Sequence, residues 1–429
     1  MRKSIGVNER PPLGQSAMLS LQHLFAMFGS TVLVPNLLGV DPAICLLMNG
    51  IGTLLYIWIS KGMIPAYLGS SFAFIAPASA IIQNAAFGES SYAAVLGGFI
   101  VVGIIFTIVA FIIQKVGTSW IDVAFPPAAM GAIIALIGLE LIPVAARNAG
   151  WISDGTADWT MNSNNVLLSV LTLTITILGS ILFRGFMRII PILFGIISGY
   201  VIAYFMKMTE MSAVSEANWI QTPQFTFPEF HWSAIIAIAP AALVVIVEHI
   251  GHLVVTSNIV GKDLQKDPGL HRSLLGNGIS TIISGFTGST PNTTYGENIG
   301  VLAITRVYST FVIGGAAIIA ILLSFSGKVA TLIAVIPPPV MGGVSLLLFG
   351  VIAASGLRML IESKVDYNKP TNLYLTIIVF VVGLSGVEFS VGDLTLTGMS
   401  LATVVALLSS LLFKLFDVLK LTNDHEKTE

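Results

Sequence analysis

The sequence predicts an all-α membrane protein with fourteen transmembrane segments, arranged as two inverted repeats of seven spans. Of its 429 residues, 55% are hydrophobic and only 10% are charged, whereas soluble domains have about 25% charged residues. The chain divides into apolar runs of membrane-spanning length, and almost all of its lysines and arginines fall on one side of those runs. Its net charge of −2 gives no reason to expect nucleic acid as a partner.

A spanning helix needs about 20 apolar residues, because the hydrocarbon core is about 30 Å thick and each residue rises about 1.5 Å. Two runs are weak: 65–83 contains Gly69, Ser70, Ser71 and Pro77, and 290–305 begins with eight mostly polar residues. The predicted spans are 14–38, 42–60, 65–83, 92–114, 125–146, 165–183, 189–206, 232–258, 273–286, 290–305, 307–326, 330–354, 372–387 and 397–418.

The positive charges support both weak spans. With fourteen spans and a cytoplasmic N-terminus, seventeen of the twenty lysines and arginines lie inside, and only Arg147, Lys207 and Lys328 lie outside. Omitting one weak span would reverse every later loop and destroy this agreement with the positive-inside rule. We therefore expect a multi-pass protein of the plasma (cell inner) membrane with both termini in the cytoplasm.

Short internal matches indicate a duplication. Residues 126–131 resemble 337–342, Gly97-Gly98 resembles Gly314-Gly315, and the Gly-Ser pair at 69–70 resembles that at 288–289. Seven spans is an odd number, so the second copy must be inverted. Inverted repeats with interrupted helices are typical of secondary transporters, whose substrate site lies near the midplane between the interruptions.

Two carboxylates fall deep within predicted spans, Glu248 and Glu297. A charge at the bilayer centre costs at least about 2.5–3.5 kcal/mol, so a functional role is favoured over a purely structural pair. His252 follows Glu248 by four residues and shares its helix face, which suits proton exchange between them. His249 is expected to point elsewhere and to pack. Glu140, at a span end, is expected to be structural.

Several activities lack their usual motifs. Cys45 is the only cysteine, so we expect neither an intrachain disulfide nor a thiolate metal site. The His249-x-x-His252 spacing suggests a metal only weakly, because no third ligand is found. No phosphate-binding loop or nucleophile elbow is present. We therefore predict no metal, no catalytic residue, no cofactor and no enzyme activity. Without an ATP site, transport is expected to be coupled to an ion gradient or to be uncoupled. A channel or an intramembrane hydrolase is the alternative of another class.

The two weak spans suggest the kind of ligand. Irregular backbone at membrane depth lines a cavity or is buried in protein, and its free N–H groups can donate to ligand carbonyls. Carboxylates accept from N–H groups. Together these groups suit a planar heterocycle with both N–H and C=O edges. Phe72 either stacks on such a ligand or packs in the core.

Two motifs resemble the nucleobase/ascorbate transporter family. Its marker is Gln, Glu or Pro, then Asn-x-Gly, four residues, and Thr followed by Arg, Lys or Gly. The chain matches it from Glu297 to Arg306, with Asn298, Gly300 and Thr305 at the defined positions. Gln22-His23 is similar to a second family motif. Residues 68–74 and 288–297 look closest to the bacterial members that carry uracil.

This resemblance implies a uracil:proton symporter that works by rocking or elevator motion in the bilayer as a homodimer, with a purine or another heterocycle as alternative cargo. It implies a short strand in the third and tenth spans, a core domain of residues 1–120 and 208–328, and a gate domain of residues 121–207 and 329–429. Glu248 and Glu297 would bind uracil, and His252 would support Glu248 in proton coupling. The remaining implied site residues are the backbone amides of Phe72 and Gly296 and the side chains of Tyr295 and Ser30.

Overall fold

The computed structural model describes residues 4–153, 155–156, 158–185, 187–209, 211–391 and 394–422. The first half of the chain contains α1 (Leu13–Leu38), α2 (Pro42–Ile59), β1 (Leu68–Ser70), η1 (Phe72–Phe74), α3 (Ile75–Ile82), η2 (Ala85–Ser90), α4 (Ser91–Val116), α5 (Ser119–Ala124), α6 (Pro127–Asn148), α7 (Ser163–Leu182), η3 (Met187–Ile189), α8 (Pro191–Phe205) and α9 (Met211–Glu216). The second half contains α10 (Trp232–Val260), η4 (Gln265–Gly269), α11 (Leu270–Thr287), β2 (Asn292–Thr294), α12 (Gly296–Thr305), α13 (Thr310–Ser324), α14 (Gly327–Ala334), α15 (Pro338–Glu362), α16 (Pro370–Leu384), β3 (Glu388–Val391), β4 (Leu394–Thr397) and α17 (Gly398–Val418).

The described part of the chain is mostly helical, and eight of its helices are long and apolar enough to cross a membrane. A ninth candidate is α13 with α14, which meet at a bend of 87°. Helices α8 and α16 have only 15 residues each, and the two weak spans consist of short pieces. The chain is therefore a multi-pass membrane protein, while the full count of fourteen spans stays a prediction.

Pro337 and Pro338 start the helix that follows α14 at a later residue than the sequence predicts. The span expected at 330–354 is wrong, because residues 330–334 belong to α14 and the next helix runs from Pro338 to Glu362. A residue before proline is driven out of helical geometry, whereas proline itself fits the first helical turn. Pro337 accordingly precedes α15 as its N-cap.

The two weak spans are joined by a short β-ladder. Strands β1 and β2 are antiparallel, with Leu68 opposite Thr294 and Ser70 opposite Asn292. The two strands implied by the family resemblance are thus confirmed. Each strand leads into a helix, η1–α3 after β1 and α12 after β2, so both spans are interrupted near their middle.

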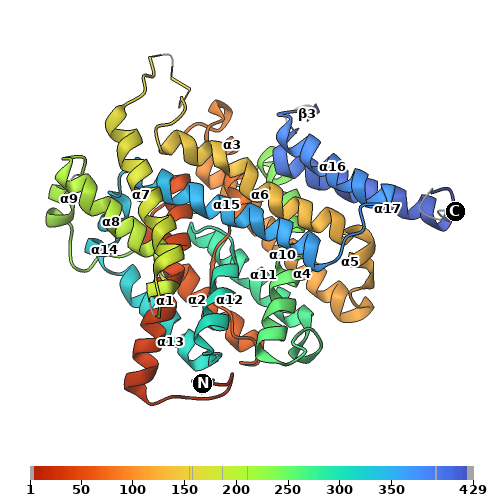
Figure 1. Cartoon of the computed structure of the whole chain (residues 1–429), viewed down its shortest axis with the longest axis horizontal. Helices are drawn as coiled ribbons and strands as arrows, with labels where there is room; N and C mark the ends of the chain where they lie inside the picture. The colour runs from red at the N-terminus through yellow and green to blue at the C-terminus, as the bar shows by residue number, and fades with distance from the viewer. Residues whose placement is uncertain are drawn as a thin grey trace.

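The helices pack as two groups. Helices α1 to α4 and α10 to α13 pack mainly against one another, and α6 to α8 with α15 to α17 form the second group. Figure 1 shows α15 lying along α6 and α16 beside α17. At the α6–α15 contact, Cβ atoms built at Gly138 and Gly356 would overlap backbone of the facing helix. Small residues there let two helices approach closely, as is common in membranes.

The chain ends bear on the predicted orientation. Residues 1–3 and 423–429 lie outside the described residues, so the cytoplasmic placement of the termini stays a prediction. The segment that follows the first three residues is paired with the chain: Ile5 forms a parallel bridge with Val307. This pairing joins the start of the chain to the turn after α12.

Candidate functional site

Helix α10 carries the first carboxylate. Glu248 and His252 lie one turn apart, with 3.9 Å between Glu248 Oε1 and His252 Nε2. Their side chains are 26% and 20% exposed, respectively. A carboxylate and an imidazole at this separation need only a small movement to share a proton, as their spacing in the sequence predicts.

Helix α12 carries the second carboxylate. Tyr295 is the N-cap, Gly296 is the first residue and Glu297 lies in the first turn. The unpaired N–H groups and positive dipole end of a helix favour a negative charge or a carbonyl oxygen at this place. A Cβ atom built at Gly296 would lie 3.2 Å from His252 Nε2, and α12, which carries Glu297 in its first turn, packs against α10, which carries Glu248. The structure thus brings both carboxylates and His252 together.

Tyr295 and Phe72 link the two interrupted spans. The Tyr295 hydroxyl donates to the carbonyl oxygen of Ser70 at 2.7 Å. The Phe72 ring stacks on Tyr295 with centroids 6.3 Å apart and meets the edge of Phe349 at 6.0 Å. Phe72 is therefore a packing residue between α15 and the site in this structure, and its backbone N–H stands at the start of η1.

The two family motifs meet in space. His23 Nδ1 lies 3.3 Å from Asn298 Oδ1, although 275 positions separate them in the chain. Thr305 accepts from the N–H of Val307, and Arg306 ends α12 in the left-handed conformation. Residues of the two motifs thus hold α12 against α1 and terminate α12.

Three predicted residues contribute less to this arrangement. Gly300 lies on the exposed side of α12, with nothing within 4 Å of a Cβ atom built there. Gln22 is half-buried on α1 next to His23. Ser30 lies in α1, but its side chain is outside the described part of the structure.

The sequence reasoning missed a set of buried polar residues behind His252. His249, expected only to pack, contacts Ser273 Oγ at 2.8 Å through Nε2, and Thr294 Oγ1 and Asn277 Nδ2 at 3.0 Å through Nδ1. A signal was present: polar residues recur every three or four positions along α11, which marks one buried polar helix face. That face comprises Ser273, Asn277, Ser280, Thr281 and Ser284.

Glu140 has the structural role that the sequence predicts. Its carboxylate accepts the backbone N–H of Met399, 3.1 Å away, at the start of α17. An acidic side chain at a helix N-terminus is stabilising. Glu140 therefore fixes α17 to α6 and is separate from the Glu248–Glu297 pair.

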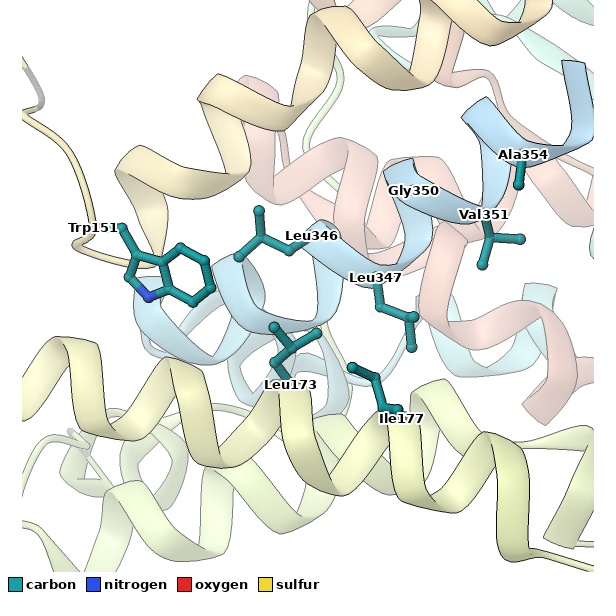
Figure 2. Close-up of a pocket in the computed structure, with 8 residues that line it drawn as sticks. All are labelled: Trp151, Leu173, Ile177, Leu346, Leu347, Gly350, Val351 and Ala354. Carbon is teal, nitrogen blue, oxygen red and sulfur yellow. The ribbon is translucent and has the colours of Figure 1, made fainter. Parts of the chain in front are cut away.

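The described residues contain no cluster of three or more His, Cys, Asp or Glu side chains suited to a metal ion. A groove of about 350 Å³ lies between α7 and α15, and Figure 2 shows Leu173 and Ile177 facing Leu346 and Leu347 across it. Its lining is almost wholly apolar, so it offers no groups that could recognise a polar ligand.

Comparison with known proteins decides the family. The family model described as "Permease family" (Xan_ur_permease) matches residues 14–392. The chain belongs to this family, the nucleobase/ascorbate transporters. It is 60% identical to the uracil permease of Paenibacillus larvae over 421 residues, covering 98% of this chain and 99% of that protein. It is also 60% identical to the uracil permease of Escherichia coli K12, covering 98% and 96% of the two chains. This family member is a transporter and not an enzyme.

Solved structures support the fold. The anion transporter SLC26A9 aligns with a TM-score of 0.72 and 11% identity, covering 94% of this chain and 65% of that one. The transmembrane domain of the cyanobacterial bicarbonate transporter BicA aligns with a TM-score of 0.66 and 13% identity, covering 94% and 98% of the chains. At such identities the likeness concerns the fold alone.

Proposed function

We propose that this chain imports uracil together with a proton across the plasma (inner) membrane. Its relatives named uracil permeases match it at 60% identity over nearly their whole length. The observation that carries the proposal is the meeting of Glu248 and Glu297 with the N-terminus of α12, between two interrupted spans. Carboxylates supply acceptors for the ring N–H groups of uracil, and helix N-termini supply donors for its carbonyls.

The mechanism follows from the same groups. Glu248 and Glu297 would accept uracil N–H groups, while the backbone N–H groups of Phe72 and Gly296 would donate to its carbonyls. Two carboxylates at one site repel each other when both are charged, so binding a proton lowers the cost of holding them together. His252, beside Glu248, would support that carboxylate in proton coupling. Cargo and proton would then share one site, which is what symport requires.

The architecture that we infer has fourteen spans in two inverted halves. A core domain of residues 1–120 and 208–328 would rock or slide against a gate domain of residues 121–207 and 329–429, with the site between them. The two groups of helices, each packed mainly within itself, support this division. We also infer cytoplasmic termini and a homodimer. Glycosylation-site or cysteine-accessibility mapping of the loops tests the topology.

Uptake of labelled uracil into cells or proteoliposomes tests the function. Glu297→Ala should abolish uptake, and dissipating the proton gradient should collapse it in the wild-type chain. Glu140→Gln is the matched control, because it also alters a carboxylate in a spanning helix but lies at the α17 cap. Uptake that survives both Glu297→Ala and loss of the gradient would contradict the proposal.

Competition distinguishes the cargo. Excess unlabelled uracil should block uptake, whereas xanthine, adenine and uric acid should not. Stronger competition by a purine than by uracil would assign a purine cargo to the same fold and site.

A further inference from the structure

A buried hydrogen-bonded cluster lies directly behind the Glu248–His252 pair. It consists of His249, Ser273, Asn277 and Thr294, whose side chains are at most 5% exposed. These residues come from α10, α11 and β2 and are not among the groups proposed to bind the cargo. Buried polar groups in a membrane protein are costly, so a cluster of four calls for a role.

Thr294 stands between two imidazoles. Its Oγ1 lies 3.0 Å from His249 Nδ1 and 3.2 Å from His252 Nδ1. A hydroxyl carries a single proton and can donate it to only one acceptor. The protonation of the two Nδ1 atoms is therefore linked through Thr294.

Asn277 decides which histidine receives that proton. Its amide nitrogen lies 3.0 Å from His249 Nδ1, so it donates to the lone pair of that atom. If the Asn277 amide were rotated by 180°, its oxygen would face His249 Nδ1 and would require a proton on that atom. His249 Nδ1 could then donate to the Thr294 hydroxyl but could not accept from it. In both arrangements His249 leaves the hydroxyl proton of Thr294 free for His252 Nδ1.

The Thr294 hydroxyl could also accept from a protonated His252 Nδ1, but its own buried proton would then lack an acceptor among the contacts of the described residues, which is costly. Donation to His252 Nδ1 therefore sets the tautomer of His252. A neutral imidazole that accepts at Nδ1 carries its proton on Nε2. In this structure Nε2 is the atom that lies 3.9 Å from Glu248 Oε1 and faces Gly296. The other ring nitrogen of His249, Nε2, is also hydrogen-bonded, to Ser273 Oγ at 2.8 Å. Ser273 is itself hydrogen-bonded to the Tyr56 hydroxyl, so the His249 ring is fixed on both sides.

We propose that His249, Asn277 and Thr294 are positioning residues that hold neutral His252 as its Nε2–H tautomer, with that N–H directed at Glu248. The tautomer assignment stands on the hydrogen bonds alone, and only its consequence for transport rests on the proposed function. That consequence is that neutral His252 presents Nε2–H to Glu248 as a hydrogen-bond donor and so favours the charged carboxylate, while the transported proton is bound by the carboxylate itself.

Nitrogen-15 NMR of the full-length chain in lipid vesicles, labelled at histidine, tests the tautomer. The signals of His252 are assigned by their loss in His252→Gln. We expect an unprotonated Nδ1 and a protonated Nε2 in the wild-type chain at neutral pH. We expect a mixture of both tautomers in Thr294→Val, which has the same shape without the hydroxyl, and a single tautomer again in Thr294→Ser. A merely structural Thr294 would leave the tautomer of His252 unchanged.

Two results would overturn the inference: a protonated Nδ1 on neutral His252 in the wild-type chain, or an unchanged tautomer in folded Thr294→Val. The wild-type spectrum decides the first even if Thr294→Val does not fold. Gradient-driven uracil uptake by folded Thr294→Val should fall about tenfold, on the scale of one lost hydrogen bond, and recover in Thr294→Ser. A wild-type chain that takes up no uracil would instead contradict the proposed function and leave the tautomer result standing.

Discussion

Gly69 lacks a side chain where the ring of Tyr295 crosses strand β1. A Cβ atom built at Gly69 would overlap the ring carbons and the hydroxyl of Tyr295. That hydroxyl is the group that bonds to Ser70 and ties the two interrupted spans together. The absence of a single methyl group therefore sets the distance between β1 and the start of α12, where Glu297 lies.

Gly69→Ala should lower the free energy of unfolding by about 1–3 kcal/mol, as overpacking of a buried site commonly does. It should also weaken uracil binding, since Tyr295 must move and α12 moves with it. Thermal unfolding and a uracil binding isotherm measure the two effects. The control is Gly14→Ala, because a Cβ atom there meets nothing within 4 Å. Equal behaviour of the two variants would refute this account.

The short β-ladder shows how an element depends on its surroundings. Two paired three-residue strands are not stable alone in water. Here the Leu68 N–H donates to the Thr53 hydroxyl on α2, and Asn292 donates to the carbonyl of Met48 and to Ser280 Oγ on α11. Two side chains and one backbone carbonyl of two continuous helices thus hold the ladder from which η1 and α12 begin.

Asn292→Ala should destabilise the protein by about 1–3 kcal/mol, because a buried carbonyl loses its side-chain donor and a cavity forms. Uracil affinity should fall as well, since the ladder positions Gly296 and Glu297. Asn258→Ala, at an exposed position near the end of α10, should change the free energy of unfolding by less than about 0.5 kcal/mol. Chemical or thermal unfolding followed with and without uracil separates the two variants.

At the scale of the whole molecule, the segment between α9 and α10 runs across the ends of one group of helices. Its backbone N–H groups at Gln221, Gln224 and Glu229 donate, respectively, to the carbonyl of Phe325, to the carboxylate of Asp41 and to the carbonyl of Ala93. All three acceptors belong to or adjoin α2, α4 and α13. The segment between α9 and α10 is therefore hydrogen-bonded to the group of helices that contains α2, α4 and α13, and we expect it to move with that group.

The Glu229 side chain makes the stability of this segment depend on pH. Hydrogen bonds from His231 and Ser90 hold the pKa of its carboxyl below the ordinary value of 4.5. Its contribution to stability is thus complete above pH 4.5 and is lost as the pH falls through the lower folded-state pKa. Glu229→Gln should lower the Tm slightly at pH 7, and the difference from wild type should vanish in acid. Glu216→Gln, exposed on α9, should show no such pH dependence.

Local features of the sequence were enough to predict the membrane class and the two interrupted spans. They also singled out Glu248, His252 and Glu297, which the structure brings near one another. Each of these predictions depends on the free energy of placing a single segment in lipid. Apolar runs are stable there, whereas an ionisable residue such as Glu248 or Glu297 is costly and therefore indicates a functional role. The same logic separated Glu140 from that pair, because it was expected near a span end; in the structure it lies within α6 and caps the start of α17. The residues of the family marker added the cargo class.

Only the tertiary structure decided how these pieces meet. The register of β1 on β2, the bond from Tyr295 to Ser70 across 225 positions, and the contact of His249 with Thr294 depend on how distant segments pack. Hydropathy cannot distinguish a buried histidine that merely fills space from one that orients its neighbour, because both are equally buried. Geometry distinguishes them, since a hydrogen bond requires donor and acceptor within a narrow range of distances and angles.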